Sequence, residues 1–169
     1  MYTAGQKRFR PKSQADIEQE LQAIAADGLP VRRVFLADGD AMTLSFRRLQ
    51  AILEVIRTYL PGVQRVSSYC LPRNLKNKSV EELATLKALG LSLMYVGCES
   101  GDDEVLAAIQ KGETFTSSLD ALQKIKQSGM KSSVMILNGM GGKHFSEQHA
   151  LNSARLMNEA QPDWYPQFL

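Results

Sequence analysis

Helical and strand-like segments alternate along almost the whole chain, and this alternation limits the fold more than any other feature. The strand-like segments begin near residues 31, 64, 91, 131 and 163. Strands that are separated by helices form right-handed βαβ units and a parallel sheet. The pattern therefore predicts an α/β fold, and the spacing of the strands suits either a doubly wound sheet or a stretch of (β/α) barrel.

The helical segments carry clear start and stop signals. Ser79 and Glu82 match a capping box at the start of a helix that ends at Gly90. The segment 13–27 opens on a cap-like Ser13, has apolar residues at helical spacing and stops before Gly28. Similar signals predict further helices over 44–60, 102–110, 116–128 and 146–160. Strands are predicted over 31–37, 64–71, 91–96 and 131–137, and more weakly from residue 163.

Composition excludes several classes of protein. The chain has 169 residues, 44% of them apolar, and a net charge of +2, which predicts one globular domain over 1–169 with a basic arm at 1–12. So small a charge does not favour a nucleic acid partner.

No apolar run reaches the roughly 20 residues of a membrane span and no secretory leader opens the chain, so we expect a cytoplasmic protein. Cys70 and Cys98 suit reduced, buried thiols better than a disulfide.

Polar residues and glycines gather after the strands rather than before them. The loops that follow the first four strands are 38–40, 71–77, 97–103 and 138–148, whereas the opposite ends read as plain helix stops. Ligands of parallel α/β proteins bind at the carboxyl ends of the strands. The sequence therefore predicts one shared site along this edge.

Familiar catalytic and phosphate-binding motifs are missing from these loops. The glycines near residue 140 match neither a P-loop nor a dinucleotide fingerprint, and no HExxH or G-x-S-x-G occurs. His144 and His149 do not have the spacing of zinc ligands, and we expect them to face solvent or to cap a helix. No catalytic residue and no metal ligand is therefore predicted.

The strand ends instead suit a small polar zwitterion that carries a ribose. Asp38 and Asp40 could hold an ammonium group, Glu99 could accept two sugar hydroxyls, and Lys111 could pair with a carboxylate. Glycines near residue 140 would let the backbone approach a flat adenine.

The same residues have a purely structural interpretation. Residues 101–103 would then only cap a helix, Glu99 would pair with a neighbouring cation, and Lys111 would lie on the surface. Four strand ends of this kind at one edge make the structural interpretation weaker for the set than for any single residue.

Three segments, in this order, resemble the radical S-adenosylmethionine (SAM) superfamily. They are "VRRVFLADGDAMTLS", "YVGCESGDDEVLAAIQKG" and "MILNGMGGKHFSEQ". Within the superfamily, the chain is most similar to Fe-S oxidoreductases with an Elp3- or coproporphyrinogen-oxidase-like core. The resemblance implies that the sheet is part of a (β/α)6 TIM-like barrel.

The resemblance also implies a role for each strand end. The turn Asp38-Gly39-Asp40 stands where relatives bind the methionine amino group of SAM. Glu99 and Ser100 stand on the ribose side, and Lys111 stands where relatives place a basic residue near the methionine carboxylate.

The third segment would contact the base of the cofactor. In relatives this segment packs against adenine, which would place Asn138 and Gly139 at the adenine and Glu147 at the acidic end of the motif. The parent enzyme would cleave SAM reductively at a [4Fe-4S] cluster and start radical chemistry on an unknown substrate.

One part of the family pattern is absent. The superfamily holds its cluster with a C-x3-C-x2-C loop after the first strand, and this chain has no such loop. Cys70 and Cys98 lie on separate βα units and cannot replace it. We therefore expect a fragment that lacks the first strand and the cluster loop, binds no cluster and is inactive alone. Its open sheet edge at 31–37 would favour a homodimer.

A different function remains open at this point. The chain could be a non-catalytic α/β module that binds a nucleotide or a phosphate at helix amino ends. A contact with RNA is a weaker third alternative, which only the basic arm supports.

Overall fold

A single parallel sheet organises the chain. The computed structural model describes residues 11–37, 40–164 and 167–168. Within these residues the sheet has five strands in the order of the sequence, each parallel to its neighbours. The strands are β1 (Arg33–Leu36), β2 (Arg65–Cys70), β3 (Leu91–Glu99), β4 (Lys131–Leu137) and β5 (Gln167–Phe168).

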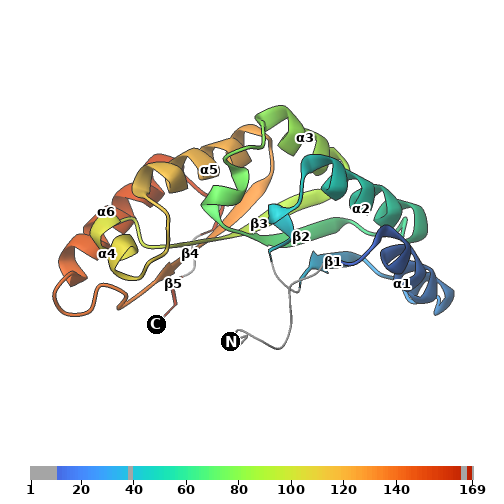
Figure 1. Cartoon of the computed structure of the whole chain (residues 1–169), viewed down its shortest axis with the longest axis horizontal. Coiled ribbons are helices and arrows are strands. Elements are labelled where there is room, and N and C mark those ends of the chain that lie inside the picture. Colours follow the sequence, from blue (N-terminus) through green and yellow to red (C-terminus); the bar gives the residue numbers. More distant parts are fainter. Residues whose placement is uncertain (1–10, 38–39, 165–166, 169) are drawn as a thin grey trace.

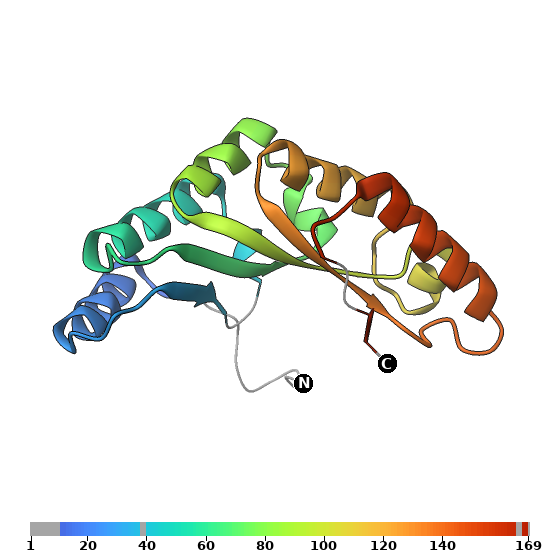
Figure 2. The same ribbon diagram turned by 180° about the vertical axis from the view of Figure 1, so that it is seen from behind.

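The helices lie on one side of this curved sheet, as Figures 1 and 2 show from opposite directions. They are α1 (Gln14–Ala26), α2 (Phe46–Tyr59), α3 (Val80–Ala88), α4 (Asp103–Ala108), α5 (Phe115–Gln127) and α6 (Ser146–Ala160), with short 3-10 helices η1 (Ala41–Thr43) and η2 (Pro72–Leu75). A doubly wound sheet has helices on both faces and a reversal in strand order. The α/β prediction is thus confirmed, and the winding is that of a barrel.

Local sequence signals account for most element boundaries. Ser79 accepts a hydrogen bond from the Glu82 N–H, and the Glu82 side chain accepts one from Ser79, so the predicted capping box forms. The predicted strand over 131–137 and helix over 146–160 have the observed bounds. The strand predicted over 91–96 is too short, because Gly97 and Glu99 still pair with β4.

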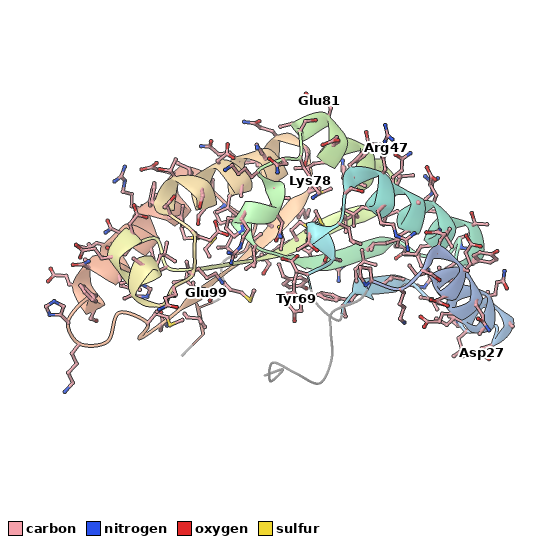
Figure 3. The ribbon with its side chains drawn as sticks, viewed as in Figure 1. Asp27, Arg47, Tyr69, Lys78, Glu81 and Glu99 are labelled. Atoms are coloured by element: carbon pink, nitrogen blue, oxygen red, sulfur yellow. The ribbon has the colours of Figure 1, made fainter. Side chains whose placement is uncertain are left out.

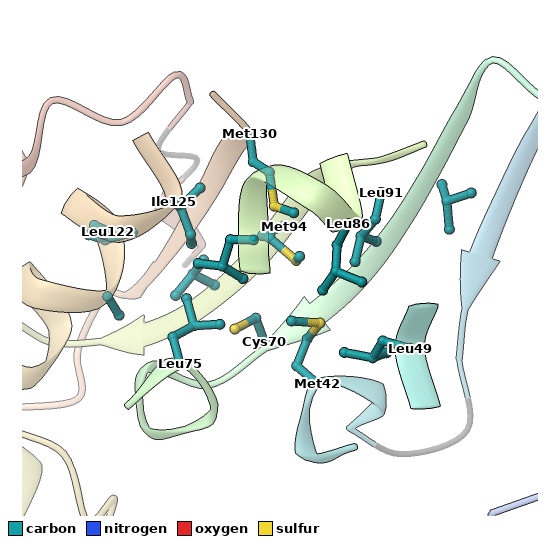
Figure 4. Close-up of a cluster of buried hydrophobic side chains, with 14 of the residues drawn as sticks. Met42, Leu49, Cys70, Leu75, Leu86, Leu91, Met94, Leu122, Ile125 and Met130 are labelled. Atoms are coloured by element: carbon teal, nitrogen blue, oxygen red, sulfur yellow. The ribbon is translucent and has the colours of Figure 1, made fainter. Parts of the chain in front are cut away.

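The hydrophobic core lies between the sheet and the helices (Figure 4). Alternate residues of each strand point into it, such as Val66 and Cys70 of β2 and Met94 and Val96 of β3. We call the other side of the sheet, away from the helices, the inner face. It carries the residues between these, including Tyr69 and Tyr95, because successive side chains of a strand point to opposite faces.

β1 is an edge strand within the described residues, and residues 1–10, most of the predicted basic arm, lie outside them. No helix in the described part of the chain is both long and apolar enough to cross a membrane.

Candidate cofactor site

Glu99 ends β3 in an unusual backbone conformation. Its φ is 65°, which non-glycine residues seldom adopt. A Cβ atom placed on Gly97 would lie only 2.8 Å from Glu99 Oε1. The carboxylate therefore folds back over Gly97, and a glycine at that position leaves the space that it needs.

Lys111 reaches the same place from the turn after α4. Its Nζ lies 2.9 Å from Glu99 Oε1, and both side chains are only 16% exposed. The structure thus brings together two predicted site residues that are twelve positions apart. This ion pair is the contact that the structural interpretation predicts for Glu99. The other carboxylate oxygen, Glu99 Oε2, has no hydrogen bond within the described residues.

The residues that follow Glu99 are buried and attach this turn to α6. Ser100 Oγ lies 2.8 Å from His149 Nδ1 and accepts a hydrogen bond from the Asp102 N–H. The Gly101 N–H donates to Ser153 Oγ. Ser100 is fully buried. Its contacts with His149 and Asp102 hold in place the turn that follows Glu99.

His149 corrects one expectation from the sequence. It is 5% exposed and does not face solvent, whereas His144 is exposed as expected. The prediction for His149 was wrong because it overlooked helical spacing. His149, Ser153 and Leu156 lie on one side of α6, and all three are buried, so the period of that helix was the signal that could have placed the histidine.

Asp40 begins η1 just after β1. Its Oδ1 accepts a hydrogen bond from the Met42 N–H, whereas Oδ2 is buried and has no hydrogen-bond partner within the described residues. Burial raises the pKa of this carboxyl above its usual value, against the opposing effects of the nearby Asn74 side-chain amide, the Met42 N–H and the Lys78 cation. An orphaned acceptor of this kind suits an ammonium group. Asp38 and Gly39 lie outside the described residues.

Lys78 lies beside the candidate site and was not predicted from the sequence. The residue is 8% exposed, and Nζ donates to the carbonyls of Met42 and Asn74 at 2.8 and 3.1 Å. The ammonium group thereby ties η1, next to Asp40, to η2. Burial lowers the pKa of Lys78. Nothing in the local pattern marks this lysine, because its partners are main-chain atoms.

The third predicted segment follows β4 and is more exposed. Asn138 and Gly139 are exposed in a turn where Gly139 has a φ of 79°, and Glu147 is exposed in the first turn of α6. Since the strands are parallel, these residues share the sheet edge with Asp40 and Glu99. Among the described residues, no hydrogen bond or ion pair joins the third segment to Asp40 or Glu99.

Both cysteines belong to the core and not to this edge. Cys70 and Cys98 are free and buried and point toward the helices. Burial raises the pKa of Cys70, and it raises that of Cys98 to about 12. In the part of the chain that the structure describes, no group of His, Cys, Asp and Glu side chains could hold a metal ion.

These thiols should be inert in the folded protein, because the thiolate is the reactive form. With 5,5′-dithiobis(2-nitrobenzoate) at mildly alkaline pH, we expect no reaction until denaturant is added, and then two thiols per chain. Rapid release of the thionitrobenzoate chromophore from the native protein would show that one cysteine is accessible.

Comparison with models of protein families gives one match. A family model for the radical SAM superfamily matches residues 2–157. A curated relative, the heme chaperone HemW of Bacillus subtilis (strain 168), is 23% identical over 142 residues, which cover 82% of this chain and 38% of the relative. The chain thus spans well under half the length of that relative.

Solved structures show the same fold at low identity. Coproporphyrinogen III oxidase (HemN) from Escherichia coli matches with a TM-score of 0.73 and 16% identity, over 91% of this chain and 36% of that one. The archaeal Elp3 of Methanocaldococcus infernus matches with a TM-score of 0.61 and 14% identity, over 92% of this chain and 41% of that one.

Proposed function

Because the chain belongs to the radical SAM superfamily, whose members use SAM and a [4Fe-4S] cluster, we propose that it supplies the SAM-binding strand ends of a radical SAM enzyme. The observation that carries this proposal is the placement of two carboxylates at one edge of the sheet. Glu99 lies over Gly97 at the end of β3, and Asp40 follows β1 with one buried oxygen that has no partner among the described residues.

Each of these residues has a role that its surroundings support. Asp40 Oδ2 would accept a hydrogen bond from the amino group of the methionine moiety. The family resemblance alone assigns the same role to Asp38, which lies outside the described residues. Glu99 would accept hydrogen bonds from the two ribose hydroxyls. Ser100 would hold the turn after Glu99 in place through its contacts with His149 and Asp102. Lys111 would then leave its ion pair with Glu99 and pair with the methionine carboxylate.

The turn after β4 completes the proposed site. Asn138 and Gly139 would lie against the adenine, where the exposed backbone at Gly139 leaves room for a flat ring. Glu147 would mark the acidic end of this segment.

The cluster does not fit the residues of this chain. In radical SAM enzymes the cluster supplies the electron that cleaves SAM, and protein thiolates hold its iron. This chain has two cysteines, both buried on the helix side of the sheet. No step through a cluster is therefore assigned to the residues described here.

Titration of the chain with SAM in a calorimeter tests the proposal directly. We expect saturable binding, and we expect Glu99→Gln to weaken it about tenfold or more, since hydrogen bonds to a charged group contribute about 1.5–3 kcal/mol. Glu81→Gln is the matched control, because Glu81 lies on the exposed side of α3, far from Glu99 (Figure 3).

Two outcomes would contradict this function. One is the absence of saturable SAM binding, and the other is an affinity that Glu99→Gln leaves unchanged. A parallel titration with adenosine diphosphate separates the alternative function, because a non-catalytic nucleotide-binding module would bind the diphosphate more tightly than SAM.

A further inference from the structure

A hollow of about 620 Å³ lies between the start of α2 and the start of α3. The described residues that line it belong to η1, η2, the first turns of α2 and α3 and the segments beside them, and none belongs to a strand. Figure 3 shows two of them, Arg47 and Lys78, on the helix side of the sheet, whereas Tyr69 lies on the inner face. We call this space the helix-side hollow. Its volume is typical of a site for a small molecule.

Positive charge dominates the lining of the helix-side hollow. Three of its side chains are cations, namely Arg47, Arg73 and Lys78, and Glu82 is the only carboxylate among the described lining residues. Glu82 already serves the capping box of α3, where it accepts a hydrogen bond from the Ser79 N–H at 3.0 Å. The lining therefore favours an anionic ligand.

Lys78 is a buried cation without a counter-ion at contact distance. Two of the three donors of its ammonium group are used by the carbonyls of Met42 and Asn74. The third donor has no partner within the described residues, and no carboxylate there forms an ion pair with Nζ. Asp40 and Glu82 act on Lys78 only from beyond ion-pair distance. Because a buried lysine is normally paired, an anion in the helix-side hollow would complete its surroundings.

Further donors lie around the same space. Arg47 is exposed and has no hydrogen bond or ion pair within the described residues. Arg73 pairs through Nε with Glu113 at 3.2 Å and donates from Nη2 to the Lys111 carbonyl, which leaves Nη1 without a partner in the described part of the chain. The N–H groups of Phe46 and Arg47 belong to the first turn of α2, where no helical carbonyl is available to them.

We propose that the helix-side hollow binds a small phosphorylated molecule through its phosphate group. A phosphate monoester has three acceptor oxygens and nearly two negative charges. It can therefore satisfy the two guanidinium groups and the Lys78 ammonium group together, which a carboxylate with two oxygens does less well. A phosphate ion alone would fill only a small part of about 620 Å³, so the organic part of the ligand has room beside it.

Calorimetric titrations at constant low ionic strength test the proposal on the chain as it is. The probes are ribose 5-phosphate, inorganic phosphate and ribose, which separate the phosphate group from the organic part. We expect saturable binding of both phosphates, with ribose 5-phosphate the tighter of the two. Ribose should show no binding, because it lacks the charged group.

Variants then locate the site. Arg47→Gln should weaken the binding of ribose 5-phosphate about tenfold, as expected for the loss of a charge-assisted contact, and Lys78→Gln should weaken it at least as much. Arg57→Gln is the matched control, because Arg57 is exposed in the last turn of the same helix. Circular dichroism shows whether each variant is folded. Arg47→Gln decides the test, since replacement of an exposed side chain leaves the core intact.

This proposal goes beyond the proposed function and does not rest on it. Arg47→Gln should leave the affinity for SAM unchanged, and Glu99→Gln should leave the affinity for ribose 5-phosphate unchanged. The two proposals can therefore fail separately.

Three results would overturn the inference. The first is the absence of saturable binding of ribose 5-phosphate, and the second is an Arg47→Gln variant that binds it as the unmodified chain does. The third is a probe that lacks one half of the ligand and still binds as tightly as ribose 5-phosphate. Equal binding of ribose would show that the phosphate group is not recognised, and equal binding of inorganic phosphate would show that only the ion is.

Discussion

Replacement of Gly101 by alanine is expected to lower the free energy of unfolding by about 3 kcal/mol, at the upper end of the usual cost of overpacking. A Cβ atom at this position would lie 2.3 Å from the Asn152 carbonyl oxygen and 2.8 Å from Ser153 Cα. Both are main-chain atoms of α6, so no side chain can rotate out of the way. The turn after β3 would have to move off the helix and lose the Gly101 N–H to Ser153 Oγ hydrogen bond.

Urea unfolding followed by circular dichroism measures this effect. Gly62→Ala is the control, because a Cβ atom there would meet only the Val31 carbonyl oxygen at an ordinary distance of 3.5 Å. Equal urea midpoints for the two variants would mean that the turn does not pack against α6 as described.

Replacement of Asp102 by asparagine should lower the free energy of unfolding by about 2 kcal/mol at neutral pH, since it removes charge-assisted hydrogen bonds from a buried group. Asp102 is 3% exposed. Its carboxylate caps α4 by accepting from the Val105 N–H and also accepts from the side-chain amides of Gln148 and Asn152. An asparagine would turn one of its own amide hydrogens toward these donors.

The cost should depend on pH. Burial alone would raise the pKa of Asp102, but the hydrogen bonds outweigh it and hold the pKa below the usual value of 3.8. A carboxyl whose pKa is lower in the folded state stabilises the fold above its unfolded pKa and loses this contribution as the pH falls through the folded one. The difference in unfolding free energy between the unmodified chain and Asp102→Asn should therefore be largest at neutral pH and shrink below about pH 3.8.

Urea unfolding at neutral and at acidic pH checks both parts of this expectation. Asp120→Asn provides the comparison, because among the described residues Asp120 pairs only with Lys124 on the surface of α5 and such pairs contribute about 0–1 kcal/mol. A cost for Asp102→Asn that stays constant with pH would show that the charge of Asp102 is not what stabilises the turn.

The sequence predicted the elements well but not the winding of the sheet. Alternation, caps such as Ser79 and stops such as Gly90 are local signals, and they act in the same way in any fold. Whether successive helices cover one face or two depends on contacts between elements far apart in the chain. The barrel winding therefore became evident only from the strand order and the single helical layer, although the resemblance had implied it.

The candidate site was predictable where residues are neighbours in sequence. Clusters such as Glu99 and Ser100 were visible as polar residues at a strand end. The direction of each side chain was not, because Ser100 and His149 meet across 49 positions and Lys78 binds main-chain carbonyls. The helix-side hollow was missed for the same reason, since Arg47 and Lys78 line one space only when η1 packs against η2.

The left-handed backbone at Glu99 has a consequence for how this protein can change. Glycine adopts such a φ with the least strain. Selection for thermal stability alone would therefore favour glycine at this position, and the carboxylate would be lost. Any attempt to engineer a sturdier version by relieving backbone strain should therefore leave this residue untouched.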